Sequence, residues 1–234
     1  MIKKWHWYVG FFILLFGGYF LYFFTQEDFA QSNLPVLSDV QPFAFTNQNG
    51  RTVSDRDAEG KVYVTEYFFT TCKGICPRMN ANMRRVYDAF KDDSSFMILS
   101  HTCMPETDSV PVLKKYEEKM LGGKLNKNED GSYKINYDTA SADRATAVNS
   151  NWNFVTGDKM ALYKMARQSY LIDNNKPDST DIADQFIHTQ FFALVDKRGR
   201  VRDIYDGLKE DEIQKLLKDI KGLLKEKYQS RSLN

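Results

Sequence analysis

The first apolar segment of the chain contains no charged residue between Val9 and Phe24. With the four residues before it, this segment has about 20 residues, enough for a helix to cross the hydrocarbon core of a membrane. Two lysines precede the segment and two acidic residues follow it. Because cationic flanks stay on the cytoplasmic side, the rest of the chain is expected to be exported. The pattern predicts a single-pass transmembrane anchor over residues 1–24.

A cleaved signal peptide is the alternative interpretation of this segment. A signal peptide ends in a small-residue cleavage site of the A-x-A type, and no such site follows the apolar run. No cysteine stands there for lipid attachment either. These observations favour an anchor that is retained in the protein.

Beyond the anchor, short β-rich apolar runs alternate with segments of helical spacing. The polar residues 25–41 are expected to form a tether, and residues 42–230 a folded domain with a polar insertion at about 122–149. Strands are expected at 61–69, 96–102, 190–195 and 201–205, hairpins at 41–53 and within the insertion through 133–137, and helices at 77–90, 109–120, 158–170 and 210–228.

This order of elements is typical of one α/β architecture. A strand, a helix, a second strand and a second helix precede a hairpin and a final helix, which is the order of a thioredoxin-like sandwich with a central mixed sheet and flanking helices. In open α/β sheets, ligands bind at the carboxyl ends of strands. A reactive loop is therefore expected after the strand at 61–69.

Charge and composition exclude several functions. The chain has 234 residues, with 32 Lys and Arg against 31 Asp and Glu, and a formal net charge of +1. This balance gives no long-range field to attract polyanions, so a nucleic-acid-binding protein is not expected. Three cysteines are too few for a disulfide scaffold. The three cysteines are therefore expected to have a chemical role.

Cys72 and Cys76 lie where the first long strand gives way to a helix that begins with Pro77. A helix N-terminus lowers the pKa of a thiol, and Lys73 adds a nearby positive charge. The two thiols are therefore expected to ionise readily, as both metal binding and redox chemistry require. The alternative is that the two cysteines are structural, either buried or joined in a static disulfide.

The spacing of the two cysteines separates the functional alternatives. Dithiol oxidoreductases prefer two intervening residues, whereas three residues separate Cys72 from Cys76. Two thiolates are soft ligands that favour Cu(I) and leave room for a third ligand. His188, just before the strand at 190–195, is the candidate, although an isolated histidine is more often a core residue. Redox enzymes of this fold usually have a cis-proline there, and no proline follows Pro177.

The chain resembles the Sco/SenC family of membrane-anchored, thioredoxin-like copper chaperones. The matching segments are KVYVTEYFFTTCKGICPRMNANM, MPETDSVPVLKKY, WNFVTGD and FIHTQFFALVDKRGRVRDIYDG. The resemblance implies copper bound by Cys72, Cys76 and His188, and delivery of that copper to the dinuclear copper site of a cytochrome c oxidase subunit. It also implies a bacterial-type inner membrane with the domain on the periplasmic side.

The sequence departs from the family pattern at two places. The family often has an Asp-Pro pair after the second strand, but Met104 precedes Pro105 here, although Asp108 matches a later acidic position. The polar insertion at 122–149 is also longer than the usual connection.

Four further residues with potential donor atoms lie near the cysteine loop in the sequence. His101 and Cys103 share one parity at the end of a strand, so they could act as extra ligands, or Cys103 could resolve a disulfide. Met79 and Met83 are four residues apart on one side of a predicted helix. For both pairs, a role in the core or at the end of the strand is the favoured interpretation.

Three classes of function follow from the sequence. The leading hypothesis is a copper-binding metallochaperone for cytochrome c oxidase. The alternative is a thiol–disulfide oxidoreductase that keeps cysteines of the oxidase subunit reduced, with Cys72 and Cys76 as the redox-active pair. A third class is a copper-responsive signalling or redox-sensing protein. A peroxidase is disfavoured, because no arginine is clearly placed to assist a peroxidatic cysteine.

Overall fold

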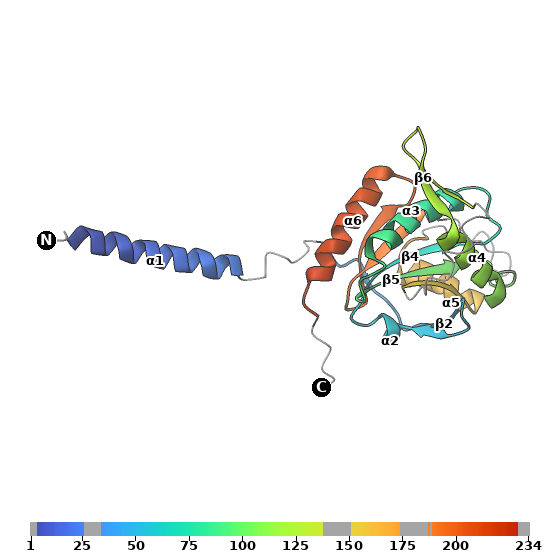
Figure 1. The fold of residues 1–234 in the computed structure, drawn as a ribbon. Helices are drawn as coiled ribbons and strands as arrows, with labels where there is room; N and C mark the ends of the chain where they lie inside the picture. Colours follow the sequence, from blue (N-terminus) through green and yellow to red (C-terminus); the bar gives the residue numbers. More distant parts are fainter. Residues whose placement is uncertain (1–3, 26–33, 138–150, 174–186, 188, 229–234) are drawn as a thin grey trace.

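The computed structural model describes residues 4–25, 34–137, 151–173, 187 and 189–228. Helix α1 (Lys4–Thr25) stands apart from the α/β domain in Figure 1. Trp7, Ile13 and Leu14 on this helix are all more than two-thirds exposed. In the described part of the chain, no helix is both long enough and apolar enough to qualify as a membrane-spanning segment.

An eight-stranded mixed sheet forms the centre of the domain, with the strand order β1-β10-β9-β4-β5-β8-β2-β3. Its central strands β4, β5 and β8 are parallel, and β9 runs antiparallel to β4. The strands are β1 (Ser38–Asp39), β2 (Ala44–Asn47), β3 (Thr52–Ser54), β4 (Val62–Phe68), β5 (Phe96–Thr102), β8 (Trp152–Thr156), β9 (Phe191–Val195) and β10 (Arg200–Asp206).

Helices cover both faces of this sheet and enclose two separate apolar cores. On one face pack α3 (Cys76–Phe90), α4 (Val110–Gly122) and α6 (Glu210–Lys225). On the other face packs α5 (Lys159–Lys164), which continues as a π-helical turn, Met165–Ser169. This arrangement confirms the predicted α/β thioredoxin-like sandwich.

Local sequence signals explain several element boundaries. Pro77 stands in the first turn of α3, where its missing N–H has no intrahelical partner. Asp158 caps α5 by accepting a hydrogen bond from the backbone N–H of Ala161 at 2.8 Å. Gly50, with φ of 73°, occupies the left-handed position in the turn between β2 and β3. A short helix, α2 (Asp55–Ala58), follows β3.

The described part of the predicted polar insertion is a two-stranded hairpin, β6 (Lys124–Lys127) with β7 (Tyr133–Asn136). The hairpin is longer than predicted and contributes to the core. Ile135 is buried against the α3 side of the sheet, and the Arg85 guanidinium lies 3.9 Å from the centre of the Tyr133 ring. Residues 138–149 of the insertion lie outside the described residues.

Two strands were not predicted from the pattern. Strand β8 pairs with β5, and β1 pairs with β10 inside the stretch expected to be a tether. The backbone N–H of Leu37 also donates to the carbonyl of Val201 at 2.8 Å. The chain is therefore already part of the domain before residue 42.

Candidate metal centre

The cysteine loop lies at the carboxyl end of β4, as the sequence predicts. The backbone N–H of Cys72 donates to the carbonyl of Phe69 at 3.2 Å, which turns the chain immediately after the strand. The N–H of Met79 donates to the carbonyl of Ile75 at 3.1 Å, so helical bonding begins within the loop. Cys76 is the first residue of α3. The strand end and the helix start therefore fix both cysteines.

Cys72 lies close enough to raise the pKa of the Cys76 thiol, and neither cysteine is part of a disulfide. Cys76 is 5% exposed, whereas Cys72 is half-buried at the edge of the same core. Cys72 is therefore the more accessible of the two thiols.

The expectation that both thiols ionise readily is wrong for Cys76. Burial raises the pKa of Cys76, and the hydrogen bond with the Cys72 side chain raises it further. Desolvation of a thiolate in an apolar core outweighs the favourable field of the helix N-terminus. Cys76 is therefore a neutral thiol at pH 7.

Asp108 holds the start of the cysteine loop in place. Its carboxylate accepts hydrogen bonds from the Thr70 hydroxyl at 2.6 Å and from the Thr102 hydroxyl at 2.5 Å. It also accepts from the Thr70 backbone N–H at 3.2 Å. Because Asp108 is almost completely buried, these charge-assisted bonds are not weakened by water. The loop is thereby tied to the end of β5.

Glu66 is a site residue that the sequence analysis missed. It lies on β4, is completely buried, and accepts a hydrogen bond from the Ser100 hydroxyl at 2.7 Å. Its other oxygen, Oε2, has no hydrogen-bond partner among the described residues. Burial raises the pKa of Glu66 to about 8, so the side chain is mainly neutral at pH 7. In the sequence, Glu66 is marked only by being the single acidic residue in a strand whose other residues are apolar or carry a hydroxyl group.

The charge of Glu66 matters to the thiols. A negative Glu66 raises the pKa of Cys76 by electrostatic repulsion. A neutral Glu66 avoids this repulsion. A neutral Glu66 with one unpartnered oxygen costs less free energy to bury than a carboxylate would.

His101 lies on the opposite face of the sheet from the cysteine loop. Its Nδ1 is 3.0 Å from the Thr65 hydroxyl, and its ring stacks on Tyr67 with 5.0 Å between ring centres. Burial lowers the pKa of His101 to about 3, so the ring is neutral. These contacts place His101 in the core, as the favoured interpretation predicts.

Cys103 belongs to the same core as His101 and is 2% exposed. Its backbone N–H donates to the carbonyl of Phe68 at 2.8 Å, and the Tyr163 hydroxyl donates to its carbonyl at 2.8 Å. Burial raises the pKa of the Cys103 thiol, with additional repulsion from Cys76 and Cys72. The thiol is therefore unsuited to nucleophilic attack on a disulfide.

Met79 and Met83 are core residues of α3. Met79 is 1% exposed and Met83 is completely buried, and both pack in the apolar cluster between α3 and the sheet. Their burial supports the interpretation that they fill the core rather than act as auxiliary donors.

His188, the predicted third ligand, lies outside the described residues. Within the described residues, no cluster of three or more His, Cys, Asp or Glu side chains could hold a metal ion. The following Thr189 donates its hydroxyl to the carbonyl of Ile172 at 2.6 Å. Because β9 is antiparallel to β4, with Thr65 opposite Ala193, β9 begins at the end of the sheet that carries the cysteine loop.

A comparison with protein families gives a match to the SCO1/SenC model over residues 35–125 and 136–225. The two matched segments include every strand of the central sheet and the cysteine loop. The chain belongs to the SCO1/SenC family. The gap between the segments falls within the insertion, where the sequence departs from the family pattern.

Individual members of the family support this assignment. The SCO1 protein homolog of Bacillus subtilis is 29% identical over 190 residues, which cover 80% of this chain and 84% of that protein. The structure of BsSco, described as a member of the Sco family of cytochrome c oxidase assembly proteins with a disulfide switch, is 28% identical. Its TM-score is 0.60, and the match covers 84% of this chain and 100% of BsSco.

A more distant structure supports the fold alone. ScoI of Bradyrhizobium japonicum, solved with copper bound, is 21% identical with a TM-score of 0.54. The match covers 80% of this chain and 100% of that one. The shared fold therefore extends beyond the relatives with higher sequence identity.

Proposed function

We propose that this SCO1/SenC protein binds copper and delivers it to the dinuclear copper site of cytochrome c oxidase during assembly. The observation that carries the proposal is the pair of free thiols of Cys72 and Cys76 in the loop at the end of β4. Two soft sulfur donors at this spacing suit Cu(I). The assembly role given for BsSco supports the same function.

His188 is the proposed third ligand of the copper. A neutral imidazole is a suitable ligand for copper. The chain immediately after it enters β9 at the same end of the sheet as the cysteine loop, which supports this assignment. The half-buried position of Cys72 provides the access that ligand exchange with an acceptor requires.

We also propose that α1 anchors the protein in a bacterial-type inner membrane, with the domain on the periplasmic side. The helix is apolar on all sides, and the large side chains described on it, from Trp5 to Phe20, are exposed. A helix of this kind needs either a protein or a lipid environment. The lysines before the helix and the acidic residues after it favour export of the domain.

Copper stoichiometry of the full chain in detergent, combined with X-ray absorption, tests the metal site. We expect one copper per wild-type chain with sulfur and nitrogen donors, and loss of bound copper in Cys76→Ser and in His188→Ala. Cys103→Ser is the matched control, because this buried thiol lies in the other core and should leave the copper content unchanged. Equal copper in wild type and in the Cys76→Ser/His188→Ala double variant would contradict the proposal.

A thiol–disulfide oxidoreductase acting on cysteines of the oxidase subunit is the second candidate. The two free cysteines in one loop favour it, because the Cys72 thiol lies close enough to Cys76 to raise its pKa. A mixed disulfide between a single Cys→Ser variant and the oxidase subunit, together with full activity of His188→Ala, would support this role. Loss of oxidase copper in His188→Ala would support copper delivery instead.

A further inference from the structure

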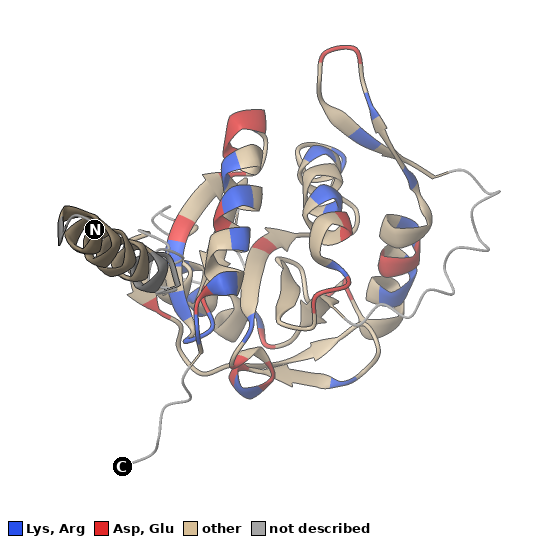
Figure 2. Cartoon of the chain, turned by 60° about the vertical axis from the view of Figure 1, so that its left-hand side comes forward, with Lys and Arg blue, Asp and Glu red and all other residues tan. Residues whose placement is uncertain are grey.

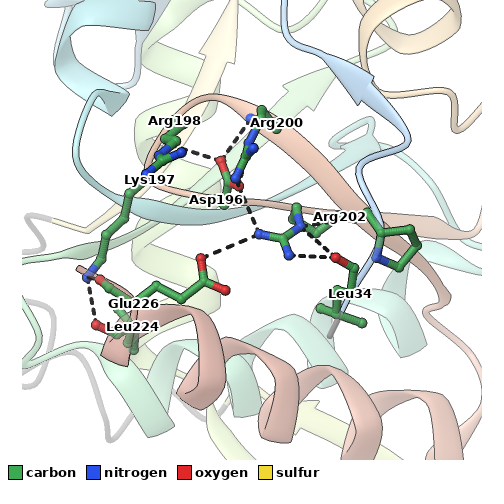
Figure 3. Close-up of polar contacts among 9 residues, drawn as sticks. Leu34, Asp196, Lys197, Arg198, Arg200, Arg202, Leu224 and Glu226 are labelled. Carbon is green, nitrogen blue, oxygen red and sulfur yellow. Dashed lines mark hydrogen bonds and ion pairs between the residues drawn. The ribbon is translucent and has the colours of Figure 1, made fainter. Parts of the chain in front are cut away.

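A buried arginine fixes the point at which the chain enters the domain. Arg202 on β10 is 5% exposed, and its guanidinium donates to the carbonyl of Leu34 at 2.6 Å and of Pro35 at 3.1 Å. The same guanidinium pairs with Asp196 at 3.0 Å and with Glu226 at 3.5 Å (Figure 3). The entry point is therefore held against the C-terminal end of α6.

A second contact joins α6 to the same place. The Lys197 ammonium group donates to the carbonyls of Leu224 at 2.6 Å and Glu226 at 2.8 Å (Figure 3). Lys197 lies in the turn between β9 and β10. The entry point, this turn and the end of α6 form one unit, which we call the base of the domain.

The base lies at the opposite end of the sheet from the cysteine loop. Strand β9 ends at Val195, which is opposite Tyr63 near the start of β4, whereas the cysteine loop follows the end of β4. Six steps along β4 at the rise of a strand separate the two ends by about 20 Å. The base and the thiols therefore face in opposite directions along the sheet.

The length of the chain between α1 and the base limits their separation. Helix α1 ends at Thr25 and the base begins at Leu34, so eight residues join them. Eight residues span at most about 30 Å even when fully extended. If α1 is in a membrane, the base cannot move far from the lipid surface.

The part of α6 nearest the base carries a row of lysines. Lys218, Lys221 and Lys225 are exposed and, at spacings of three and four, lie on one side of the helix. Among the described residues, none of the three forms an ion pair. Figure 2 shows acidic residues at the start of α6 and basic residues along the rest of it.

The acidic groups around this row already have partners. Asp219 accepts a hydrogen bond from the Tyr205 hydroxyl at 2.8 Å, and Glu226 pairs with Arg202. Glu59 accepts a hydrogen bond from the hydroxyl of Tyr228, three residues after the end of α6, at 2.6 Å. Hydrogen bonds from neutral tyrosine hydroxyls do not cancel charge, so the three lysines stand beside one aspartate, Asp219, on this part of α6.

We propose that Lys218, Lys221 and Lys225 bind anionic phospholipid headgroups, so that the base faces the bilayer and the cysteine loop faces away from it. The proposal rests on the anchoring of α1 proposed above. Each lysine near an anionic lipid surface gains electrostatic attraction. The thiols are then held about 20 Å or more above the lipid surface. A protein that accepts copper must reach this height with its own metal site.

Lysine acetylation of the full, copper-free chain in lipid nanodiscs tests the proposal. The discs contain phosphatidylcholine alone or phosphatidylcholine with phosphatidylglycerol, and mass spectrometry measures the rate at each lysine. We expect acetylation of the three lysines to be about fivefold slower in the anionic discs. Lys73, exposed in the cysteine loop at the other end, is the internal control and should react at the same rate in both. Salt at about 0.5 M should remove the difference.

A second measurement follows the height of the cysteine loop. A fluorescent donor on Cys72 of Cys76→Ser reports energy transfer to acceptors in the bilayer. We expect less transfer in anionic discs than in neutral ones. Replacing the three lysines with glutamine should abolish this difference, and replacing them with arginine should preserve it.

Equal acetylation of the three lysines in both lipids, or slower acetylation of Lys73 alone, would overturn the proposal. A chain that does not co-purify with the discs would overturn both the proposal and the anchoring of α1. Copper binding is measured independently in detergent, so its failure can be distinguished from a failure of lipid binding.

Discussion

At the base of the domain, Arg202 and Asp196 are both buried, and each is held by several partners. Near the cysteine loop, Asp108 accepts three hydrogen bonds, but other buried polar groups have fewer partners. Glu66 Oε2 and Asn80 Oδ1 have none among the described residues, and neither does His101 Nε2 on the other face of the sheet. The base therefore retains its charges, whereas burial keeps Glu66 and His101 mainly uncharged at pH 7.

The paired charges at the base thus stabilise the fold, whereas the reactive thiols lie at the other end of the same sheet. A buried ion pair whose partners are all present holds the chain in a single arrangement, and removal of one partner leaves an uncompensated charge. A buried neutral acid or imidazole instead makes stability depend on pH. Substitutions at the two ends should therefore have different signatures.

The largest effect is expected at the base. Arg202→Ala should lower the free energy of unfolding by roughly 3 kcal/mol, because among the described residues Asp196 keeps only Arg200 as an ion-pair partner and the carbonyls of Leu34 and Pro35 lose their donor. Urea denaturation measures this loss. Glu226→Gln is the control, since its contact with Arg202 is longer, at 3.5 Å, and lies at the surface of the network. If Arg202→Ala does not fold, Arg202→Lys should show an intermediate loss. A loss as small as that of Glu226→Gln would contradict the assigned role.

The next effect is the pH dependence caused by Glu66. Its pKa is about 8 in the folded chain against an ordinary value of 4.5, so between pH 6.5 and 8 the folded state holds a proton that the unfolded state lacks. Raising the pH therefore favours unfolding, by up to about 1.4 kcal/mol per pH unit. Glu66→Gln should remove this decline. An unchanged decline in the variant would assign the dependence to another group.

His101 should act in the opposite direction at lower pH. Its pKa is about 3 when folded against an ordinary value of 6.5, so below pH 6.5 the unfolded state binds the extra proton. Stability from this group falls as the pH decreases, by up to about 1.4 kcal/mol per unit.

Between pH 4.5 and 6.5 the effects of Glu66 and His101 largely offset each other in the wild type. Denaturation over this range should show a plateau in the wild type and a rise with pH in Glu66→Gln. In His101→Gln, stability should instead fall as the pH rises. Parallel curves in all three proteins would refute the offset.

The sequence predicted most of the elements that position the site. The expected strand at 61–69 is β4 (Val62–Phe68), and the expected helix at 77–90 is α3 (Cys76–Phe90). Apolar runs and the proline at the start of α3 were sufficient, because these elements are decided locally. Strand β8 was missed, because five residues next to a polar insertion give little periodicity.

The electrostatics of the site were much less predictable. The position of Cys76 at a helix start was correct, but the inferred direction of its pKa was wrong, because the depth of burial is a property of the packed core. Glu66 and Arg202 are charged residues in strands, and the sequence alone does not say which is paired. Pairing depends on residues more than 100 positions away, as Arg202 with Leu34 shows.

The smallest effect is expected for the methionine sulfurs near the cysteine loop. Met79 lies in the first turns of α3 and is buried in the core, so Met79→Leu should change the free energy of unfolding by less than about 1.5 kcal/mol. Copper stoichiometry should remain unchanged, because the sulfur of Met79 packs in the core rather than binding the metal. Met83→Leu, one turn further from the loop, is the matched control. Loss of copper in Met79→Leu alone, with the stability of both variants preserved, would instead make Met79 a ligand and show that the site extends beyond the two thiols into the core.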